Sequence, residues 1–337
     1  MKIIPFAFKN ILRNRRRSLL AVSSVFLSIL MVVILGAFAN GFLDSLVKNY
    51  IKNETGHLNI STKAYRDKAR FMPVEEYIED ASSLSALLQG ELAKLDPKAT
   101  VAQRIRFGVL LSSEKGTKQA LGVAGDPELE KGLLMLHTLV QPGGSYISAP
   151  GQAIIGAKLA EDLGLGVGDP LKIVTQKSDG GLGFKRLSIA GIFKTGVNAF
   201  DGSLFQMSLA DAQDLLGMED GAQQISIMFS NRKNLGTRTE ATAGLLKESG
   251  RGELSLLPWT AIGEYPKMIQ LMEVVYLWVY VVVGFLGAFI IANVMTMVVL
   301  ERKRETGILM AMGMTKRQIL AMFLAEGTLL EIGRAHV

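Results

Sequence analysis

Two long apolar segments without a single charge set the main constraint on this chain. Residues 18–43 and residues 274–300 contain no Asp, Glu, Lys or Arg. As helices that rise about 1.5 Å per residue, each would be roughly 40 Å long, which exceeds the roughly 30 Å hydrocarbon core of a bilayer. Buried core helices of soluble domains rarely run this far without a charge. The sequence therefore predicts two transmembrane helices that flank a large domain, residues 44–273.

Positive charge is concentrated on the outer flanks of these two segments. The cations before the first segment are Lys2, Lys9, Arg13, Arg15, Arg16 and Arg17, and those after the second are Arg302, Lys303, Arg304, Lys316 and Arg317. Cations on both flanks mark them as cytoplasmic and place residues 44–273 outside the cytoplasm. The net charge of +6 is thus explained by topology, and nucleic acid is not an expected partner.

The N-terminal residues 1–17 are expected to form an amphipathic helix on the cytoplasmic membrane surface. Their apolar side chains fall on one helical face and their cations on the other. An alternative is a secretory signal peptide, because Ala37 and Ala39 are spaced like a cleavage site. The apolar segment is longer than the roughly 7 to 15 residues of a signal core, which favours a retained helix.

The segment between the two spans has a mixed α/β pattern. The stretch "VAQRIRFGVLLSS" predicts a strand with Arg104 and Arg106 on the face opposite the apolar residues, and "SSEKGTK" predicts a hairpin into "QALGVAG". "QAIIGAKLAEDLGLGVGDPLKIVT" predicts strand, short helix, glycine turn and strand, "LSIAGIF" and "QISIMFS" two further strands, and "SLADAQDLLG" a helix. The expected fold class is an α+β membrane protein, with transmembrane helices flanking a mixed α/β extracytoplasmic domain.

Motifs of catalysis are missing from the sequence. "GLGVGD" follows a predicted helix, whereas a phosphate-binding loop precedes one, and no G-x-x-x-x-G-K-[ST] or G-x-S-x-G motif occurs. His57 and His137 have no neighbours at metal-ligand spacing, and without cysteine there are neither disulfides nor thiolate sites. We therefore expect no enzyme activity, cofactor or metal.

Small residues suggest a packing face on the second span. Gly284, Ala288 and Ala292 recur every four residues, so they form one stripe where another helix can approach closely. The carboxamide of Asn293 lies well inside the span and needs a hydrogen-bond partner, which membrane proteins usually provide on a neighbouring helix or the helix backbone. A structural role for Asn293 is favoured over a role in substrate binding.

The charged stretch after the second span predicts a helix, a break and a second helix. Gly313 is a suitable residue to end the first helix. Thr315 stands three residues before Gln318, which is the spacing of a capping box. We expect this segment, residues 301–317, to lie at the cytoplasmic membrane surface.

The same segment has two interpretations from its spacing alone. Glu301, Glu305, Ile308 and Met312 share one helical face, so a docking contact with a groove in a soluble protein is one interpretation. The other is that the cations only fix topology while the apolar residues lie among the lipid headgroups.

A family resemblance favours the docking interpretation. The stretch "NVMTMVVLERKRETGILMAMGMTKRQILAMFLAE" resembles the C-terminal permease signature of the FtsX/MacB/LolCE superfamily of ABC transporter membrane subunits. The residues that match the signature are Glu301, Arg302, Glu305, Gly307, Leu309, Ala311 and Gly313. "TGHLNI", "IIGAKLAEDLGLGVGD" and "AGIFKTGVNAFD" are similar to the lipoprotein-releasing LolC/LolE branch, and "FKNILRNRRRSLL" to the opening of the family.

The resemblance implies a permease subunit of the bacterial inner membrane that releases lipoproteins toward the outer membrane. It implies four spans, a large periplasmic domain, an identical or related second permease, and separate ATPase subunits. Residues 301–317 would be the coupling helix that contacts the ATPase. Val33, Phe38 and Phe42 are expected to contact the acyl chains of the lipoprotein and membrane lipids. Within the family, MacB-like efflux and FtsX-like mechanotransmission stay open as alternatives.

The C-terminal residues bear on a last alternative, a two-span transmembrane sensor. A sensor should continue into a long polar signalling helix, whereas residues 318–330 begin a third apolar segment. We expect that this third span is truncated and that "EIGRAHV", residues 331–337, is a translated sequencing adapter, so that the natural protein is longer.

Overall fold

The computed structural model describes residues 15–301 and 303–322. The predicted amphipathic helix before residue 15, Arg302, the end of the third apolar segment and the adapter-like residues 331–337 lie outside the described residues. The chain divides into two compact units. We call Met1–Leu46 with Lys267–Val337 the helical unit, and Val47–Pro266 the α/β unit.

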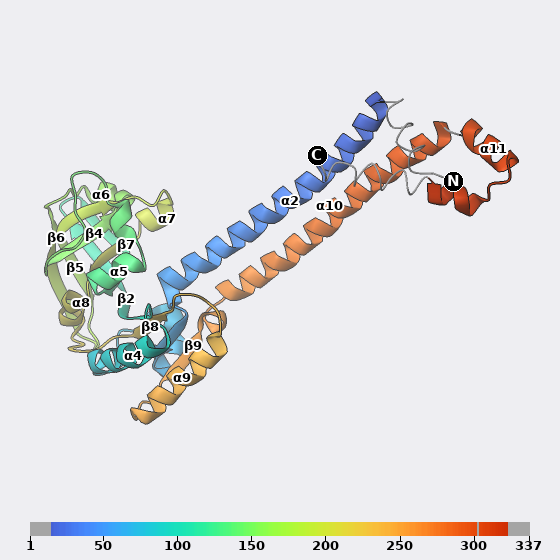
Figure 1. The fold of residues 1–337 in the computed structure, drawn as a ribbon. Coiled ribbons are helices and arrows are strands. Elements are labelled where there is room, and N and C mark those ends of the chain that lie inside the picture. The colour runs from blue at the N-terminus through green and yellow to red at the C-terminus, as the bar shows by residue number, and fades with distance from the viewer. Residues whose placement is uncertain (1–14, 302, 323–337) are drawn as a thin grey trace. The chain divides into compact units, whose positions relative to one another are not determined.

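The described part of the helical unit contains α2 (Arg15–Tyr50), α10 (Tyr265–Glu301), α11 (Lys303–Ala311) and a further helical segment at residues 316–322. Helices α2 and α10 lie side by side, and the Tyr280 hydroxyl donates a 3.5 Å hydrogen bond to the Gly36 carbonyl oxygen (Figure 1). Within residues 15–301 and 303–322, two segments are long and apolar enough to cross a membrane, Ile29–Thr55 and Tyr265–Phe289. The prediction of two membrane-length apolar helices is confirmed, although both helices continue past the charge-free segments.

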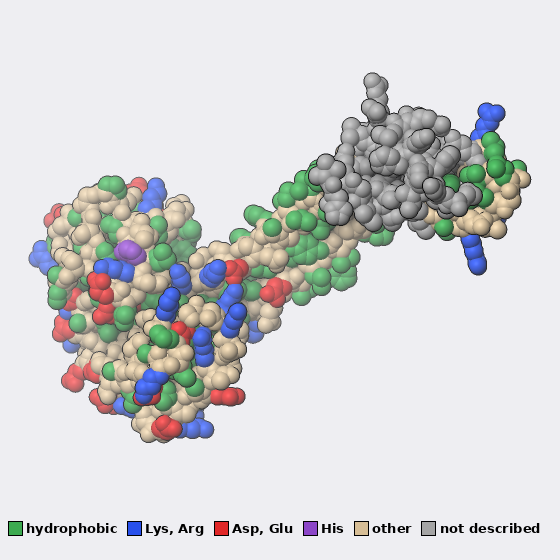
Figure 2. Space-filling model, in the orientation of Figure 1, with side chains coloured by type: hydrophobic (Ala, Val, Ile, Leu, Met, Phe, Trp, Pro, Cys, Tyr) green, Lys and Arg blue, Asp and Glu red, His purple; other side chains and the backbone are tan. Residues whose placement is uncertain are grey.

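Side-chain chemistry separates the two units. Figure 2 shows apolar side chains over the exposed faces of the long helices and charged side chains of both signs over the α/β unit. The apolar side chains exposed along α2 and α10 suit a bilayer, because the free energy of transfer of apolar surface from water to an apolar environment is favourable.

The α/β unit is built from short helices and nine strands. Its elements are η1 (Ile51–Thr55), β1 (Leu58–Ser61), α3 (Lys63–Lys68), η2 (Ala69–Phe71), α4 (Ala81–Leu95), β2 (Thr100–Ser113), β3 (Gly116–Gly125), α5 (Pro127–Gly132), η3 (Leu136–Leu139), β4 (Gln152–Gly156), α6 (Ala157–Leu163), β5 (Pro170–Gln176), β6 (Leu182–Phe193), α7 (Asn198–Asp201), β7 (Leu204–Ser208), α8 (Leu209–Leu216), β8 (Gln224–Met228), α9 (Leu235–Glu248), β9 (Ser255–Pro258) and η4 (Trp259–Ala261).

Strand β2 organises the sheet, whose order is β3-β7-β4-β6-β5-β2-β8-β1-β9. The same strand also pairs with β3, so β2, β3, β7, β4, β6 and β5 close into a ring. Its C-terminal half pairs with β5 and its N-terminal half with β8. Because β2 is long enough to pair with both, one strand joins the closed ring to the open extension β8-β1-β9.

Three groups of buried side chains fill the α/β unit. The largest lies inside the ring and includes Phe107, Leu171 and Phe205. A second packs α4 against the extension, around Leu88 and Ile225. A third lies under the segment that carries η3, on the outer side of part of the ring. Buried apolar side chains therefore pack both the inside of the ring and the segment that covers part of its outer side.

Most of the predicted α/β elements are confirmed. The strand, the hairpin and the strand, helix, turn and strand series correspond to β2, β3, β4, α6 and β5, and the other predictions to β6, β8 and α8. Strands β1, β7 and β9 were not predicted, since they are short and lack a clear alternating pattern. Arg104 does lie on the face opposite the strand's apolar residues, but it is buried there.

Candidate functional site

Helix α11 ends in a well-defined glycine cap. Gly313 has a φ of +94°, in the left-handed region. The Gly313 amide donates to the Met310 carbonyl at 3.0 Å, and the Met314 amide donates to the Leu309 carbonyl at 3.1 Å. This pair of bonds is the Schellman motif, which satisfies carbonyls at a helix end and favours glycine at the left-handed position. The predicted break at Gly313 is confirmed.

The predicted capping box after this break is also present. The Gln318 amide donates to Thr315 Oγ1 at 3.4 Å, and Gln318 Oε1 accepts from the Thr315 amide at 2.9 Å. Reciprocal bonds of this kind satisfy two amides at the first turn of a helix. Two consecutive caps thus fix the reversal between α11 and the following helix with the chain's own hydrogen bonds.

The signature residues are distributed along this segment. Glu301 is the last residue of α10, while Glu305, Gly307, Leu309 and Ala311 lie in α11. The side chains of Glu301 and Glu305 lie outside the described residues, as does Arg302.

Gly307 and the apolar residues near it on α11 are exposed. A Cβ atom built on Gly307 would meet nothing within 4 Å, and Ile308, Met310 and Met312 are exposed. The described fold of this chain therefore gives no reason for glycine at this position, where glycine costs about 1 kcal/mol relative to alanine in a helix.

The small-residue stripe of α10 is also open. Gly284, Ala288 and Ala292 are exposed, and a Cβ atom on Gly284 would meet nothing within 4 Å. Asn293 is exposed as well. Helix α2 therefore contacts α10 elsewhere, at Gly36 and Tyr280, and the stripe's role in helix packing stays a prediction.

The proposed acyl contacts lie on the exposed surface of α2. Val33, Phe38 and Phe42 are all exposed, and the rings of Phe38 and Phe42 stack with centroids 6.3 Å apart and planes 7° from parallel. Their contact with acyl chains stays a prediction.

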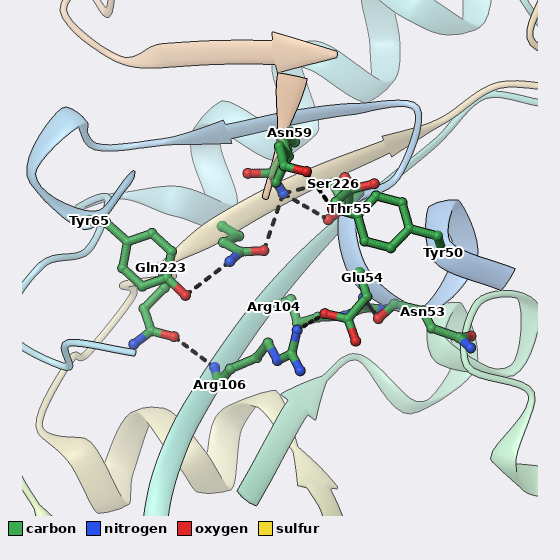
Figure 3. Close-up of polar contacts among 12 residues, drawn as sticks. Tyr50, Asn53, Glu54, Thr55, Asn59, Tyr65, Arg104, Arg106, Gln223 and Ser226 are labelled. Atoms are coloured by element: carbon green, nitrogen blue, oxygen red, sulfur yellow. Dashed lines mark hydrogen bonds and ion pairs between the residues drawn. The ribbon is translucent and has the colours of Figure 1, made fainter. Parts of the chain in front are cut away.

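A polar network holds the residues that follow α2 to strand β2. Arg104 Nη1 donates to the Asn53 carbonyl oxygen of η1 at 2.7 Å, and Arg106 forms an ion pair with Glu54 (Figure 3). Arg104 and Arg106 are two residues apart on one strand, so both side chains project from the same face. They bind consecutive residues of η1 and hold it against the sheet.

The anchor of this network is a buried ion pair. Arg104 Nε lies 3.0 Å from Glu130 Oε1, and Nη2 lies 2.9 Å from Oε2. The exposed fractions of the two side chains are 1% and 0%. Burial raises the pKa of the Glu130 carboxyl, and the Arg104 guanidinium opposes that rise. Sequence reasoning did not predict this pair, since alternation predicts only the face of a strand and not what covers it.

Two glutamines complete the network. Gln223 is fully buried, and its Oε1 accepts a 2.7 Å hydrogen bond from the Arg106 amide (Figure 3). Its Nε2 donates a 2.8 Å hydrogen bond to the Pro73 carbonyl oxygen. Gln224 donates to the Tyr65 hydroxyl at 2.9 Å, and burial raises the pKa of that hydroxyl. Buried polar groups with both partners present fix one geometry, because any alternative leaves a group unpaired.

The two histidines in the described part of the chain, His57 and His137, fit structural roles. His57 is buried, and its Nδ1 accepts the Phe229 amide at 3.0 Å, while His137 packs edge-on against Tyr146. Burial, with the charges of Arg238 and Arg232, lowers the pKa of His57 to about 4. Among the described residues, no group of three or more acidic or histidine side chains is arranged to hold a metal ion.

Two family models match this chain. Residues 18–243 match the MacB-like periplasmic core domain, and residues 277–332 match the FtsX-like permease C-terminal domain. The chain belongs to the FtsX/MacB/LolCE permease superfamily. The first match spans the first apolar segment and most of the α/β unit, and the second spans most of α10, all of α11 and the caps that follow.

Curated relatives of this permease are distant. It is 24% identical over 180 residues to the lipoprotein-releasing system transmembrane protein LolC of Neisseria meningitidis, which covers 52% of this chain and 43% of that relative. It is 24% identical over 252 residues to LolC of Xylella fastidiosa, covering 72% and 59%. An uncharacterized ABC transporter permease of Methanocaldococcus jannaschii is 24% identical over 340 residues, covering 96% and 78%. The chain thus spans less than half of the first of these relatives.

Among solved structures, the permease is similar to the periplasmic region of MacB from Actinobacillus actinomycetemcomitans. The TM-score is 0.44 at 10% identity, covering 68% of this chain and 98% of that one. The extracellular domain of the transporter YknZ from Gram-positive bacteria gives a TM-score of 0.40 at 15% identity, covering 59% and 97%.

Proposed function

We propose that this chain is the membrane permease subunit of an ABC transporter that couples ATP hydrolysis by separate ATPase subunits to the release of lipoproteins. In this proposal the chain spans the bacterial inner membrane several times, the α/β unit lies in the periplasm, and lipoproteins leave toward the outer membrane. Two relatives that carry the name of lipoprotein-releasing proteins support the cargo, and the cations on both outer flanks support the orientation.

The observation that carries the proposal is the geometry of α11. Helix α11 is capped at its end by Gly313, and the Thr315 capping box starts the next helix directly afterwards. A helix capped in this way can transmit a displacement of the ATPase without unwinding. The open space above Gly307 and the exposed Ile308 form a surface with room for another protein. We assign the ATPase contact to the signature residues Glu301, Arg302, Glu305, Gly307, Leu309, Ala311 and Gly313. For movement to be transmitted, the ATPase must contact this surface differently in its two nucleotide states.

The remaining open surfaces of the helical unit suit other membrane partners. The stripe of Gly284, Ala288 and Ala292, with Asn293 beside it, would pack against further spans or the second permease subunit, identical or related. Val33, Phe38 and Phe42 would contact the acyl chains of the lipoprotein. Apolar contact is the interaction that such chains can make, since they carry no hydrogen-bonding groups.

The test is charge reversal at Glu305, in the complete gene read to its stop codon. Glu305→Lys is expected to abolish ATP-dependent release of a lipoprotein from proteoliposomes that contain the permease and its ATPase, while membrane insertion is unchanged by protease protection. Glu248→Lys is the matched control, because Glu248 is an exposed acid at the end of α9. If Glu305→Lys released lipoprotein normally, residues 301–317 would serve only to fix the membrane topology, and the proposed ATPase contact would be wrong.

MacB-like efflux is the second candidate, because the MacB-like core domain is the longer of the two family matches. FtsX-like mechanotransmission is a third, favoured by the C-terminal match. Depletion in cells separates the three: retained lipoproteins in the inner membrane support our proposal, drug sensitivity supports efflux, and failed cell-wall hydrolysis supports mechanotransmission. A kinase or methyl-accepting domain in the complete gene would instead identify a sensor.

A further inference from the structure

The helix of the first apolar segment ends in an unusual turn. Helix α2 continues directly into η1, which is a π-helix. The Gly56 amide donates a 2.7 Å hydrogen bond to the Ile51 carbonyl, five residues back, whereas an α-helix would bond it to the Lys52 carbonyl. Single π turns are rare and occur frequently at functional sites. The turn at the end of α2 therefore holds one residue more than an α-helical turn would.

Contacts with the sheet fix the C-terminal end of this turn (Figure 3). Arg104 Nη1 donates to the Asn53 carbonyl at 2.7 Å, while its other two nitrogens bind the buried Glu130 carboxylate. Gly56 has a φ of +70°, and a Cβ atom there would lie 3.0 Å from the backbone nitrogen and oxygen of Ile227, so this close approach requires glycine. Because the sheet end of η1 is fixed, a change in the turn must move α2 instead.

The second arginine contact of η1 is incomplete. Arg106 Nη1 forms an ion pair with Glu54, and the two side chains are 21% and 36% exposed. Arg106 Nε is buried and has no hydrogen-bond partner among the described residues. Buried donors in native structures are nearly always satisfied, so an exception needs a physical reason. A second arrangement of η1 supplies one: a small movement of Glu54 toward Nε would give Arg106 the two-bond pairing that Arg104 already makes.

We propose that η1 is a two-state turn, π in this structure and α when α2 moves, with Arg104 and Arg106 as its positioning residues. In the α state the Gly56 amide bonds the Lys52 carbonyl, and Glu54 accepts from both Nε and Nη1 of Arg106. The side chains of α2 then turn by one residue relative to the sheet, about 100° at 3.6 residues per turn. The inference rests on the proposed function, because the ATPase supplies the movement, and it names the turn that responds to it.

One contact distinguishes the two forms of the turn. Lys52 Nζ lies 3.6 Å from Sδ of Met135, the residue that directly precedes η3 in the segment covering part of the ring. Lys52 lies within the turn, so the rotation in the α form would carry its side chain away from Met135. The sequence contains no cysteine, so cysteines introduced at positions 52 and 135 would be its only thiols.

The test is reversible crosslinking in proteoliposomes that contain the ATPase and the permease from the complete gene, with any further cysteine replaced by serine. A bifunctional methanethiosulfonate should join Lys52→Cys to Met135→Cys in the nucleotide-free complex. Crosslinking should be lost after the complex is trapped with ATP and vanadate. The joined permease should lose lipoprotein release, and dithiothreitol, which cuts the crosslink, should restore it.

Ser112→Cys with Thr117→Cys is the matched control. The two hydroxyl oxygens lie 3.1 Å apart in the β2–β3 hairpin, at the other end of β2 from Arg104. This pair should crosslink equally in both nucleotide states, and the joined permease should release lipoprotein normally.

Arg106→Lys is the decisive variant, because lysine keeps the positive charge but cannot present two nitrogens to the Glu54 carboxylate. Its thermal unfolding temperature should stay close to that of the parent, since the π form contains only one such bond. Crosslinking between positions 52 and 135 should persist in the trapped complex, which a purely structural role of Arg106 would not produce.

Three results would overturn the proposal: equal crosslinking of positions 52 and 135 in both nucleotide states, normal release by the joined permease, or loss of crosslinking on trapping in Arg106→Lys as in the parent. The crosslinking yields depend on nucleotide and not on cargo. A parent permease that releases no lipoprotein would therefore contradict the proposed function, while the crosslinking comparison would still decide whether η1 has two states.

Discussion

Arg104 and Glu130 form an ion pair with two hydrogen bonds, Nε to Oε1 at 3.0 Å and Nη2 to Oε2 at 2.9 Å. Both side chains are buried inside the α/β unit. The same guanidinium donates its third group to the Asn53 carbonyl of η1. One buried arginine therefore connects strand β2 to α5 and to the segment that follows α2.

The first prediction concerns this ion pair. Arg104→Met should destabilise the α/β unit by about 3 to 5 kcal/mol, because it leaves the Glu130 carboxylate buried without a partner. Glu130→Met should cost a similar amount. The loss of unfolding free energy in the double variant should be well below the sum of the two single losses, since the double variant leaves neither charge buried. Denaturant unfolding of the chain in detergent measures the cycle, and additive costs would show that the two residues do not depend on each other.

The second prediction concerns Gln223, whose side chain bonds the Arg106 amide and the Pro73 carbonyl. Gln223→Leu should cost about 2 to 4 kcal/mol, because it leaves two backbone groups buried and unpaired at about 1 to 3 kcal/mol each. The control is Gln141→Leu, at an exposed position, which should be close to neutral. Amide hydrogen exchange of Arg106 gives a local readout: unchanged protection in Gln223→Leu would contradict the assigned bond.

The third prediction is a pH dependence from His57. Its pKa is about 4 in the folded state and 6.5 when unperturbed, so between these values the unfolded chain binds a proton that the folded chain does not. Stability from this group is therefore complete above pH 6.5 and falls as the pH drops, by about 2 kcal/mol at about pH 4.5.

His57→Asn isolates this contribution, because an asparagine oxygen can accept the Phe229 amide but does not titrate. The difference in unfolding free energy between wild type and variant should shrink or change sign as the pH falls from 7 to about 4.5. A difference that is constant across this range would mean that His57 does not titrate in it.

The fourth prediction contrasts two glycines of the α11 segment. Gly313→Ala should weaken the helix end by roughly 1 to 2 kcal/mol, since an L-residue is strained at a φ of +94°. Gly307→Ala should stabilise α11 by up to about 1 kcal/mol, because the added Cβ meets nothing and glycine is a poor helix former. Hydrogen exchange at the Met312 to Met314 amides should rise in the first variant and not in the second. If both variants changed the stability of the helix in the same direction, the cap geometry at Gly313 would be wrong.

Local signals sufficed for the elements that depend on short-range chemistry. The break at Gly313 and the Thr315 capping box follow from residue types at fixed spacing, because their hydrogen bonds join residues only a few positions apart. The hairpin between β2 and β3 follows in the same way from polar turn residues between two alternating stretches. By contrast, β1, β7 and β9 are short strands whose pairing partners stabilise them, so their own residues carried little signal.

The sequence by itself determined the two membrane-length helices, the class of the domain between them, and the helix, break and helix after the second span. Charge-free length, alternation and caps are properties of consecutive residues. Only the tertiary structure decided that β2 closes a ring, that Arg104 is buried against Glu130, and that Arg104 and Arg106 hold the π turn η1 against the sheet. These relationships join residues far apart in the chain, and a strand's alternation specifies two faces without specifying what packs on either.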